Sequence, residues 1–384
     1  MILHTLIDYD TLRVIWWVLL GVLLIGFALT DGFDLGTGML LPFVGRSDVE
    51  RRVVINSIGP VWEGNQVWLV LAGGAIFAAW PQLYAVSFSG FYLAMFAILF
   101  ALILRPVGFK YRSKHDDPRW RSNWDIALFI GGFVPSLIFG VALGNVLLGV
   151  PFRLDNDLRA FYEGGFFGLL TPFAVLCGLV SVGMLLAHGA SWLRLKTRGP
   201  VAERARSIGM VAALATFVLY ALAGFFLWSM VDGYRITSVI DPTAASNPLR
   251  KTVELVAGGW FDNYTNHSWT IIAPVLGLAG LLGAFLGLAA RKDAVSFLSG
   301  CVAIVGIICS VGASMFPIIL PSSIDPRSSL AVWDASSSHM TLFIMLVATV
   351  IFMPIIVAYT SWVYRVLWGK VTEADVTDEN RHAY

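Results

Sequence analysis

Long apolar stretches alternate with short polar segments along the whole chain. A transmembrane helix needs about 20 consecutive, mostly apolar residues. Nine stretches meet this requirement: residues 14–40, 53–75, 80–104, 124–147, 165–188, 208–231, 270–290, 294–318 and 340–364. The stretch 53–75 is the weakest, because Glu63, Asn65 and Gln66 interrupt it. The pattern predicts an all-α polytopic membrane protein in which residues 1–384 form one integral membrane domain.

The composition supports this class of protein and excludes others. Hydrophobic residues make up 57% of the chain and charged residues 13%, whereas soluble domains carry about 25% charged residues. That share is too small for the surface of a soluble enzyme or for a disordered chain, and the net charge of +1 favours no nucleic-acid partner. Cys177, Cys301 and Cys309 lie in apolar stretches, so the sequence predicts neither a disulfide framework nor a cysteine metal site.

Nine helices place the two termini on opposite sides of the membrane. The connections on one side, together with the C-terminal tail, hold 19 Lys and Arg residues, and the other side holds 7. Basic residues are retained in the cytoplasm, so we expect a periplasmic N-terminus and a cytoplasmic C-terminus. Omitting 53–75 from the membrane would leave basic clusters on both sides, which supports the ninth helix.

Glu63 is the strongest candidate for chemistry, because ionisable groups inside transmembrane helices are costly and mostly functional. It lies ten residues beyond Val53, and therefore about 15 Å into the membrane from the cytoplasmic side. At that depth burial favours the neutral acid, as a proton relay requires. Asn65 and Gln66 can hold hydrogen bonds or water beside it. The alternative role is that of a neutral, hydrogen-bonded packing residue.

Asp31 and Asp34 are three residues apart, so their carboxylates share one face of a helix. They lie about 27–32 Å past Arg13 along the first helix, near the cytoplasmic surface, where they could deliver protons to Glu63. Capping of the helix end is their alternative role. Arg105 closes the third stretch on the same side. It either neutralises one of these acids or extends its charge to the interface, and residue type alone favours the interface.

The histidines bear on whether the chain binds haem by itself. A membrane haem needs an axial His or Met that faces the interior of a helix bundle. His188 and His339 lie at the ends of predicted helices, and the other four histidines lie in tails or loops. We therefore expect this chain alone to bind no haem and no other metal. Trp62 and Trp68 flank Glu63 inside the membrane, unlike the tryptophans near helix ends.

Several segments resemble subunit II of cytochrome bd-type ubiquinol oxidases, a family whose relatives include the cyanide-insensitive oxidases. The resemblance is carried by IWW at 15–17, GFALTDGFD at 26–34, WEGNQVW at 62–68, FAAWP at 77–81, FSGFY at 88–92 and RPVGF at 105–109. It continues with AASNPL at 244–249, MFP at 315–317 and WDA at 333–335. The segments occur in the family's order and span nearly the whole chain.

The resemblance implies a heterodimer with a homologous subunit I, in which each subunit has nine helices arranged as two four-helix bundles and one peripheral helix. Subunit I would carry haems b and d and oxidise quinol, and the complex would reduce oxygen to water in the bacterial inner membrane. Subunit II would contribute a cytoplasmic proton path through Glu63, where some members have Asp, and an apolar oxygen path near Trp68. The resemblance leaves open a structural quinone, a bound membrane lipid and a small accessory subunit.

Two other functions stay open. A secondary transporter could use Asp31, Asp34 and Glu63 as coupling acids. Such proteins have broken helices at matching positions in two halves, and only the region 61–68 looks broken here. A purely structural subunit could instead stabilise a haem protein without taking part in its chemistry.

Overall fold

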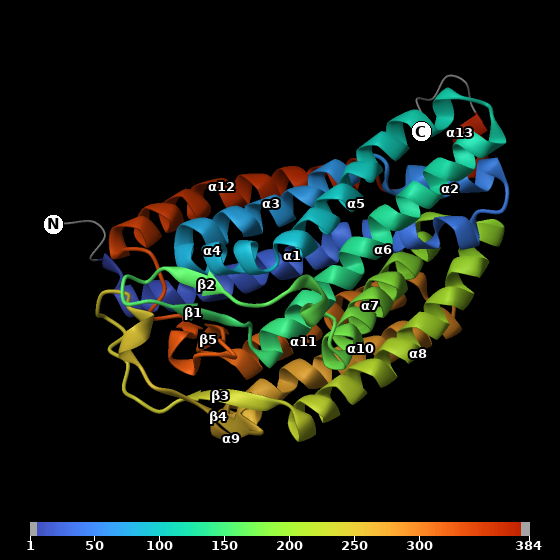
Figure 1. Ribbon diagram of the computed structural model, residues 1–384. Coiled ribbons are helices and arrows are strands. Elements are labelled where there is room, and N and C mark those ends of the chain that lie inside the picture. The colour runs from blue at the N-terminus through green and yellow to red at the C-terminus, as the bar shows by residue number, and fades with distance from the viewer. Residues whose placement is uncertain (1–5, 378–384) are drawn as a thin grey trace.

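The computed structural model describes residues 6–377, and Figure 1 shows a bundle of long helices that run side by side. The helices are α1 (Tyr9–Val44), α2 (Asp48–Ile58), α3 (Trp62–Ala79), α4 (Pro81–Gly90), α5 (Tyr92–Tyr111), α6 (Pro118–Leu148), α7 (Pro172–Lys196), α8 (Gly199–Met230), α9 (Asp262–Asn266), α10 (Ile272–Ala289), α11 (Asp293–Met315), α12 (His339–Val366) and α13 (Glu373–Thr377). Three short antiparallel hairpins pair β1 (Phe152–Leu154) with β2 (Ala160–Tyr162), β3 (Asp232–Ile236) with β4 (Val253–Ala257) and β5 (Ile318–Leu320) with β6 (Leu330–Ala331).

Eight helices among the described residues are long and apolar enough to cross a membrane, namely α1, α5, α6, α7, α8, α10, α11 and α12. The predicted all-α, multi-pass class is therefore confirmed. Several helices extend past the predicted apolar limits: α7 continues to Lys196, and α8 already begins at Gly199. Polar residues can continue a helix beyond the bilayer because its hydrogen bonds lie within its own backbone.

The predicted helix 53–75 is not continuous. α2 ends at Ile58 and α3 begins at Trp62. Pro60 lies between them, and proline donates no backbone hydrogen bond and clashes with the preceding turn, so the helix breaks there. α3 has 18 residues and is therefore about 27 Å long, but its polar first turns keep it out of the group of eight.

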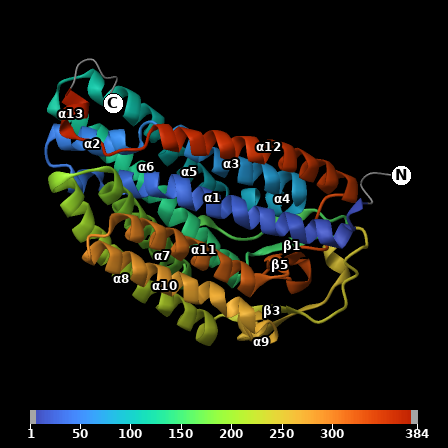
Figure 2. The same ribbon diagram turned by 180° about the vertical axis from the view of Figure 1, so that it is seen from behind.

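The contacts between α1 and α12 show that these two helices run in the same direction. Near their starts, the ring of Tyr9 stacks on His339 at 5.3 Å between centroids. Near their other ends, Asn65 joins Asp34 of α1 to Tyr364 of α12, and Figure 2 shows the two helices side by side. Because each crossing reverses the chain, parallel first and last helices need an odd number of passes. α3 provides the pass that the eight helices lack.

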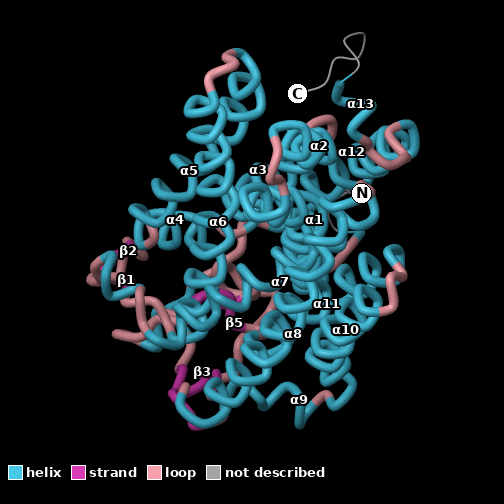
Figure 3. The backbone as a smooth tube through the Cα atoms, turned by 90° about the vertical axis from the view of Figure 1, so that its right-hand side faces the viewer, coloured by secondary structure: helices cyan, strands magenta, loops and turns pink. Residues whose placement is uncertain are grey.

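The long helices form two groups with one helix outside them. α1, α3, α5 and α6 pack together, as do α7, α8, α10 and α11, and the two groups meet where α7 packs against α1 and α6. Figure 3 shows these groups one above the other. α12 packs mainly against α1 and α3, and Leu342 is its only buried residue. This arrangement agrees with two four-helix bundles and one peripheral helix.

Glycine allows α1 and α7 to approach closely. A Cβ atom on Gly36 would overlap the carbonyl oxygen of Leu185, and one on Gly189 would overlap the backbone of α1 at Gly36. Small residues commonly allow such close crossings in membranes. This crossing lies next to the turn of α1 that carries Asp31 and Asp34, so it helps to enclose both acids.

Two buried cations hold the loops at the end of the bundle where α1 begins. Arg13, which is fully buried, donates hydrogen bonds to Ser336 Oγ at 2.7 Å and to the carbonyl of Pro242 at 2.6 Å. Lys251 Nζ lies 2.6 Å from Asp334 Oδ2. Burial lowers the pKa of Lys251 and raises the pKa of Asp334, and their pairing opposes both shifts. Two family segments, AASNPL and WDA, therefore lie in one anchored loop region.

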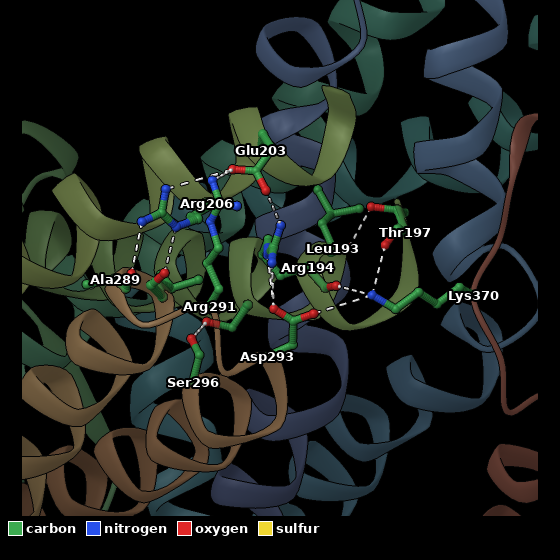
Figure 4. A network of polar contacts seen from close by, with 12 residues as sticks. Leu193, Arg194, Thr197, Glu203, Arg206, Ala289, Arg291, Asp293, Ser296 and Lys370 are labelled. Atoms are coloured by element: carbon green, nitrogen blue, oxygen red, sulfur yellow. Dashed lines mark hydrogen bonds and ion pairs between the residues drawn. The ribbon is translucent and has the colours of Figure 1, made fainter. Parts of the chain in front are cut away.

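A polar network closes the opposite end of the second bundle (Figure 4). Asp293, at the start of α11, accepts from Arg194 at 2.9 Å and from Lys370 at 3.3 Å. Glu203 pairs with Arg194 at 2.8 Å and with Arg206 at 3.8 Å. Because Lys370 lies just beyond α12, this network ties the end of the peripheral helix to the second bundle.

Candidate functional site

Asp31 and Arg105 form an ion pair inside the first bundle. Arg105 donates from Nη2 to Asp31 Oδ1 at 2.6 Å and from Nη1 to Asp31 Oδ2 at 2.9 Å. The two residues are 0% and 2% exposed. A two-pronged pair of this kind satisfies both charged groups away from water. The expected extension of Arg105 to the interface is therefore wrong, and the residue neutralises an acid.

Asp34 lies one turn further along α1 and forms no ion pair with any residue that the structure describes. Its Oδ2 accepts a hydrogen bond from Asn65 Nδ2 at 2.7 Å, and Asn65 Oδ1 accepts one from the Tyr364 hydroxyl at 2.6 Å. Asp34 is 1% exposed, so protein encloses the acid that was expected near the cytoplasmic surface of the membrane. α1 continues past Asp34 to Val44, so the alternative role of capping a helix end is wrong.

A small cavity of about 10 Å³ adjoins Asp34 between α1, α2, α5 and α6. Asp34 Oδ1 and Thr37 Oγ1 are buried and have no hydrogen-bond partner among the described residues, and both residues line this cavity. Its volume is about that required by one water molecule. A water there would give both oxygen atoms a partner, as buried polar groups generally require.

Glu63 is exposed in the isolated chain. Its side chain is 65% exposed and lies 3.7 Å from Nζ of Lys110, which is itself 59% exposed. The predicted deep burial of Glu63 assumed a continuous helix from Val53. The break at Pro60 instead places it in the first turn of α3, on the outer side of the bundle.

The other predicted residues of this segment divide between two sides of α3. Asn65 is buried and contacts Asp34 rather than Glu63. Gln66 is half-buried, and the structure shows no polar contact from it to the acids. The ring of Trp68 packs on Gly26 of α1. Sequence reasoning therefore assigned the wrong neighbour to Asn65.

A groove of about 470 Å³ runs between α1, α3 and α12. Its lining is formed by Thr30, Trp68, Val357, Thr360, Ser361, Tyr364, Arg365 and Trp368. Tyr364 thus lies between the groove and the buried Asn65. No sequence pattern indicated this role, because a tyrosine at the end of a transmembrane helix is typical of an interfacial belt.

His188 lies inside the bundle rather than at a helix end, because α7 continues two turns beyond it to Lys196. It is 1% exposed, its Nε2 bonds to the carbonyl of Leu29 at 3.0 Å, and its ring stacks on Phe297 at 4.8 Å. A Cβ atom on Gly300 would come within 3.1 Å of Nδ1. Such close packing does not fit a haem at this histidine.

Comparison with known proteins places this arrangement in a family. Residues 12–367 match the model for cytochrome bd terminal oxidase subunit II. The chain is 50% identical to cytochrome bd-I ubiquinol oxidase subunit 2 of Escherichia coli K12, over 98% of this chain and all of that one. It is also 50% identical to a probable cytochrome oxidase subunit 2 of Haemophilus influenzae, with the same coverage.

A solved structure extends the likeness to the fold. The bd oxidase of Geobacillus thermodenitrificans contains a chain that matches with a TM-score of 0.68 and 17% identity, covering 93% of this chain and 98% of that one. The fold and the relatives together define a multi-pass membrane subunit of a respiratory terminal oxidase. The chain belongs to the cytochrome bd terminal oxidase subunit II family. It is thus a subunit of a bd-type ubiquinol oxidase and works in a complex with subunit I.

Proposed function

We propose that this subunit conducts protons from the cytoplasm toward the oxygen-reducing haems b and d, which subunit I carries, with Asp34 as the buried relay and Glu63 as the contact to the partner. The observation that supports it most is the buried Asp34 carboxyl, which has a hydrogen bond on one oxygen and a water-sized cavity at the other. A structural subunit has no need of an unpaired acid at this depth. Acids inside transmembrane bundles commonly mark proton routes.

The surface around Glu63 supports its place at a subunit interface. The two helices that carry Glu63 and Lys110 also expose apolar residues, including Val67 on α3 and Phe100 and Ile103 on α5. A charged pair is costly against lipid hydrocarbon but is tolerated against a polar partner surface. Subunit I is therefore proposed to cover the outer face of α3 and α5.

Glu63→Gln tests this role. The amide keeps the size and hydrogen bonding of the side chain but cannot release a proton. Quinol-dependent oxygen uptake per haem is expected to fall about 10–100-fold, less than for a fully enclosed relay, because water can bypass an acid near an interface. The matched control is Glu373→Gln, which changes an exposed acid of α13. Equal uptake in the two variants would leave Glu63 a surface residue.

The direction of proton flow depends on orientation. The end that holds Arg194, Arg206 and Lys370 is the basic end, and the proposed nine passes place it in the cytoplasm. Alkaline phosphatase fused to the C-terminus is expected to be inactive, and a fluorescent protein fused there is expected to fluoresce. The reverse pattern would contradict both the orientation and the proposed direction of proton flow.

The groove supports a second contribution, an oxygen path. Oxygen partitions into apolar space, and the groove is lined by Trp68 of α3 and Val357 of α12 and borders Thr30 of α1. Filling it with Val357→Trp is expected to raise the KM for oxygen several-fold with little change in kcat. Ile355→Trp, an exposed position of α12 outside the groove lining, is the control. An unchanged KM in Val357→Trp would exclude this route.

A further inference from the structure

The peripheral helix α12 reaches the buried acid through a single side chain. The Tyr364 hydroxyl donates a hydrogen bond to Asn65 Oδ1 at 2.6 Å, and Asn65 Nδ2 in turn donates one to Asp34 Oδ2 at 2.7 Å. Three helices, α12, α3 and α1, each contribute one member of this chain of hydrogen bonds. Apart from Leu342, the described residues of α12 are not buried, and its packing on the first bundle comes from partly buried side chains such as Phe343 and Leu346.

The contact with Tyr364 determines which end of the Asn65 amide faces Asp34. A carboxamide has an accepting oxygen at one end and a donating NH₂ group at the other, so each neighbour meets only one of them. Because the phenol donates to the oxygen of Asn65, the NH₂ group is directed at Asp34. A donor directed at a carboxyl group favours its ionised form, whereas a carbonyl oxygen in that position would favour the protonated form.

We propose that Tyr364 is a positioning residue for proton transfer, which sets the orientation of the Asn65 amide and thereby the hydrogen bond that Asp34 receives. This inference rests on the proposed function, since it assumes that Asp34 relays protons. It also gives the peripheral helix a role beyond packing. An amide does not itself carry the proton onward, so the relay continues from the free Oδ1 of Asp34.

The segment after α12 keeps Tyr364 in place. Lys370 Nζ donates to the carbonyl of Arg194 at 3.1 Å, and Val371 N donates to the carbonyl of Lys196 at 2.7 Å. The Tyr364 ring also meets the ring of Trp192 edge-on, with centroids 6.3 Å apart. α12 is thus anchored to α7 beside the residue that contacts Asn65.

A double-mutant cycle in the assembled complex tests the proposal, with oxygen uptake per haem as the readout. Tyr364→Phe keeps the ring and removes the hydroxyl, and is expected to lower kcat about 3- to 10-fold, because a positioning hydrogen bond rather than the acid is lost. In an Asn65→Ala background the same change should have no further effect, since Tyr364 acts through that amide. Tyr359→Phe, an exposed tyrosine of α12, is the control and should match wild type.

Infrared difference spectra provide a readout that packing alone would not change. The carbonyl band of protonated Asp34, assigned by its absence in Asp34→Asn, should persist to higher pH in Tyr364→Phe than in wild type. Wild-type kcat with an unmoved band, additive effects in the cycle, or loss of haem from Tyr364→Phe would each overturn the proposal. If Asp34→Asn itself turned over normally, the proton path would fail instead, so the two failures are distinguishable.

Discussion

Asp34→Asn should lower quinol-dependent oxygen uptake by about 10²–10⁴-fold at unchanged haem content, the range typical of a lost acid–base group. The amide can still accept the hydrogen bond from Asn65, so the packing should survive. The loss should exceed that of Glu63→Gln because Asp34 is 1% exposed and bulk water cannot replace it.

Asp116→Asn is the matched control for Asp34→Asn. Asp116 is a fully exposed acid paired with Arg121, so its replacement should leave oxygen uptake at the wild-type level. Uptake within a factor of two of wild type in Asp34→Asn would show that Asp34 is a packing residue.

Arg105→Leu should prevent stable assembly of the complex. The change leaves the Asp31 carboxylate buried without its cation, and breaking a buried pair in this way costs about 3–5 kcal/mol. Haem retained after detergent extraction, and the melting temperature of whatever complex is recovered, should both fall.

The double variant Arg105→Leu with Asp31→Leu should recover much of that loss, because apolar replacement of both partners removes the buried charge. Arg153→Gln breaks a pair whose side chains are each 50% exposed, and exposed pairs contribute about 0–1 kcal/mol, so it should have little effect. Normal haem content in Arg105→Leu would show that the Asp31–Arg105 pair is not needed for the fold.

The hydropathy pattern predicted the class of fold because a bilayer demands long apolar helices whatever their neighbours are. The same demand hides which side of each helix faces the protein, since both sides are apolar. For this reason the sequence could not show that Asn65 faces Asp34 while Glu63 faces outward. Pro60 can be read in the sequence. Only the backbone of the structure, however, shows that the helix breaks there and that Glu63 therefore lies in the first turn of α3.

The candidate site was partly predictable because its members lie in family segments. GFALTDGFD supplies Asp31 and Asp34, WEGNQVW supplies Asn65, and RPVGF supplies Arg105. The pairing of Asp31 with Arg105 was not predictable, because an arginine at a helix end can extend to water as easily as it can pair with an acid. Tyr364 was missed since its partner lies 299 positions away in the chain.

Time-resolved proton uptake tests the central claim, that protons for oxygen reduction pass through Asp34 of this subunit. The fully reduced complex would be mixed rapidly with oxygen in the presence of a pH-indicator dye, while haem absorbance follows electron transfer. The account predicts that in Asp34→Asn oxygen still binds and the first electron transfer keeps its rate, whereas proton uptake slows at least as much as steady-state turnover, with Asp116→Asn unchanged. Proton uptake at the wild-type rate in Asp34→Asn would contradict the account.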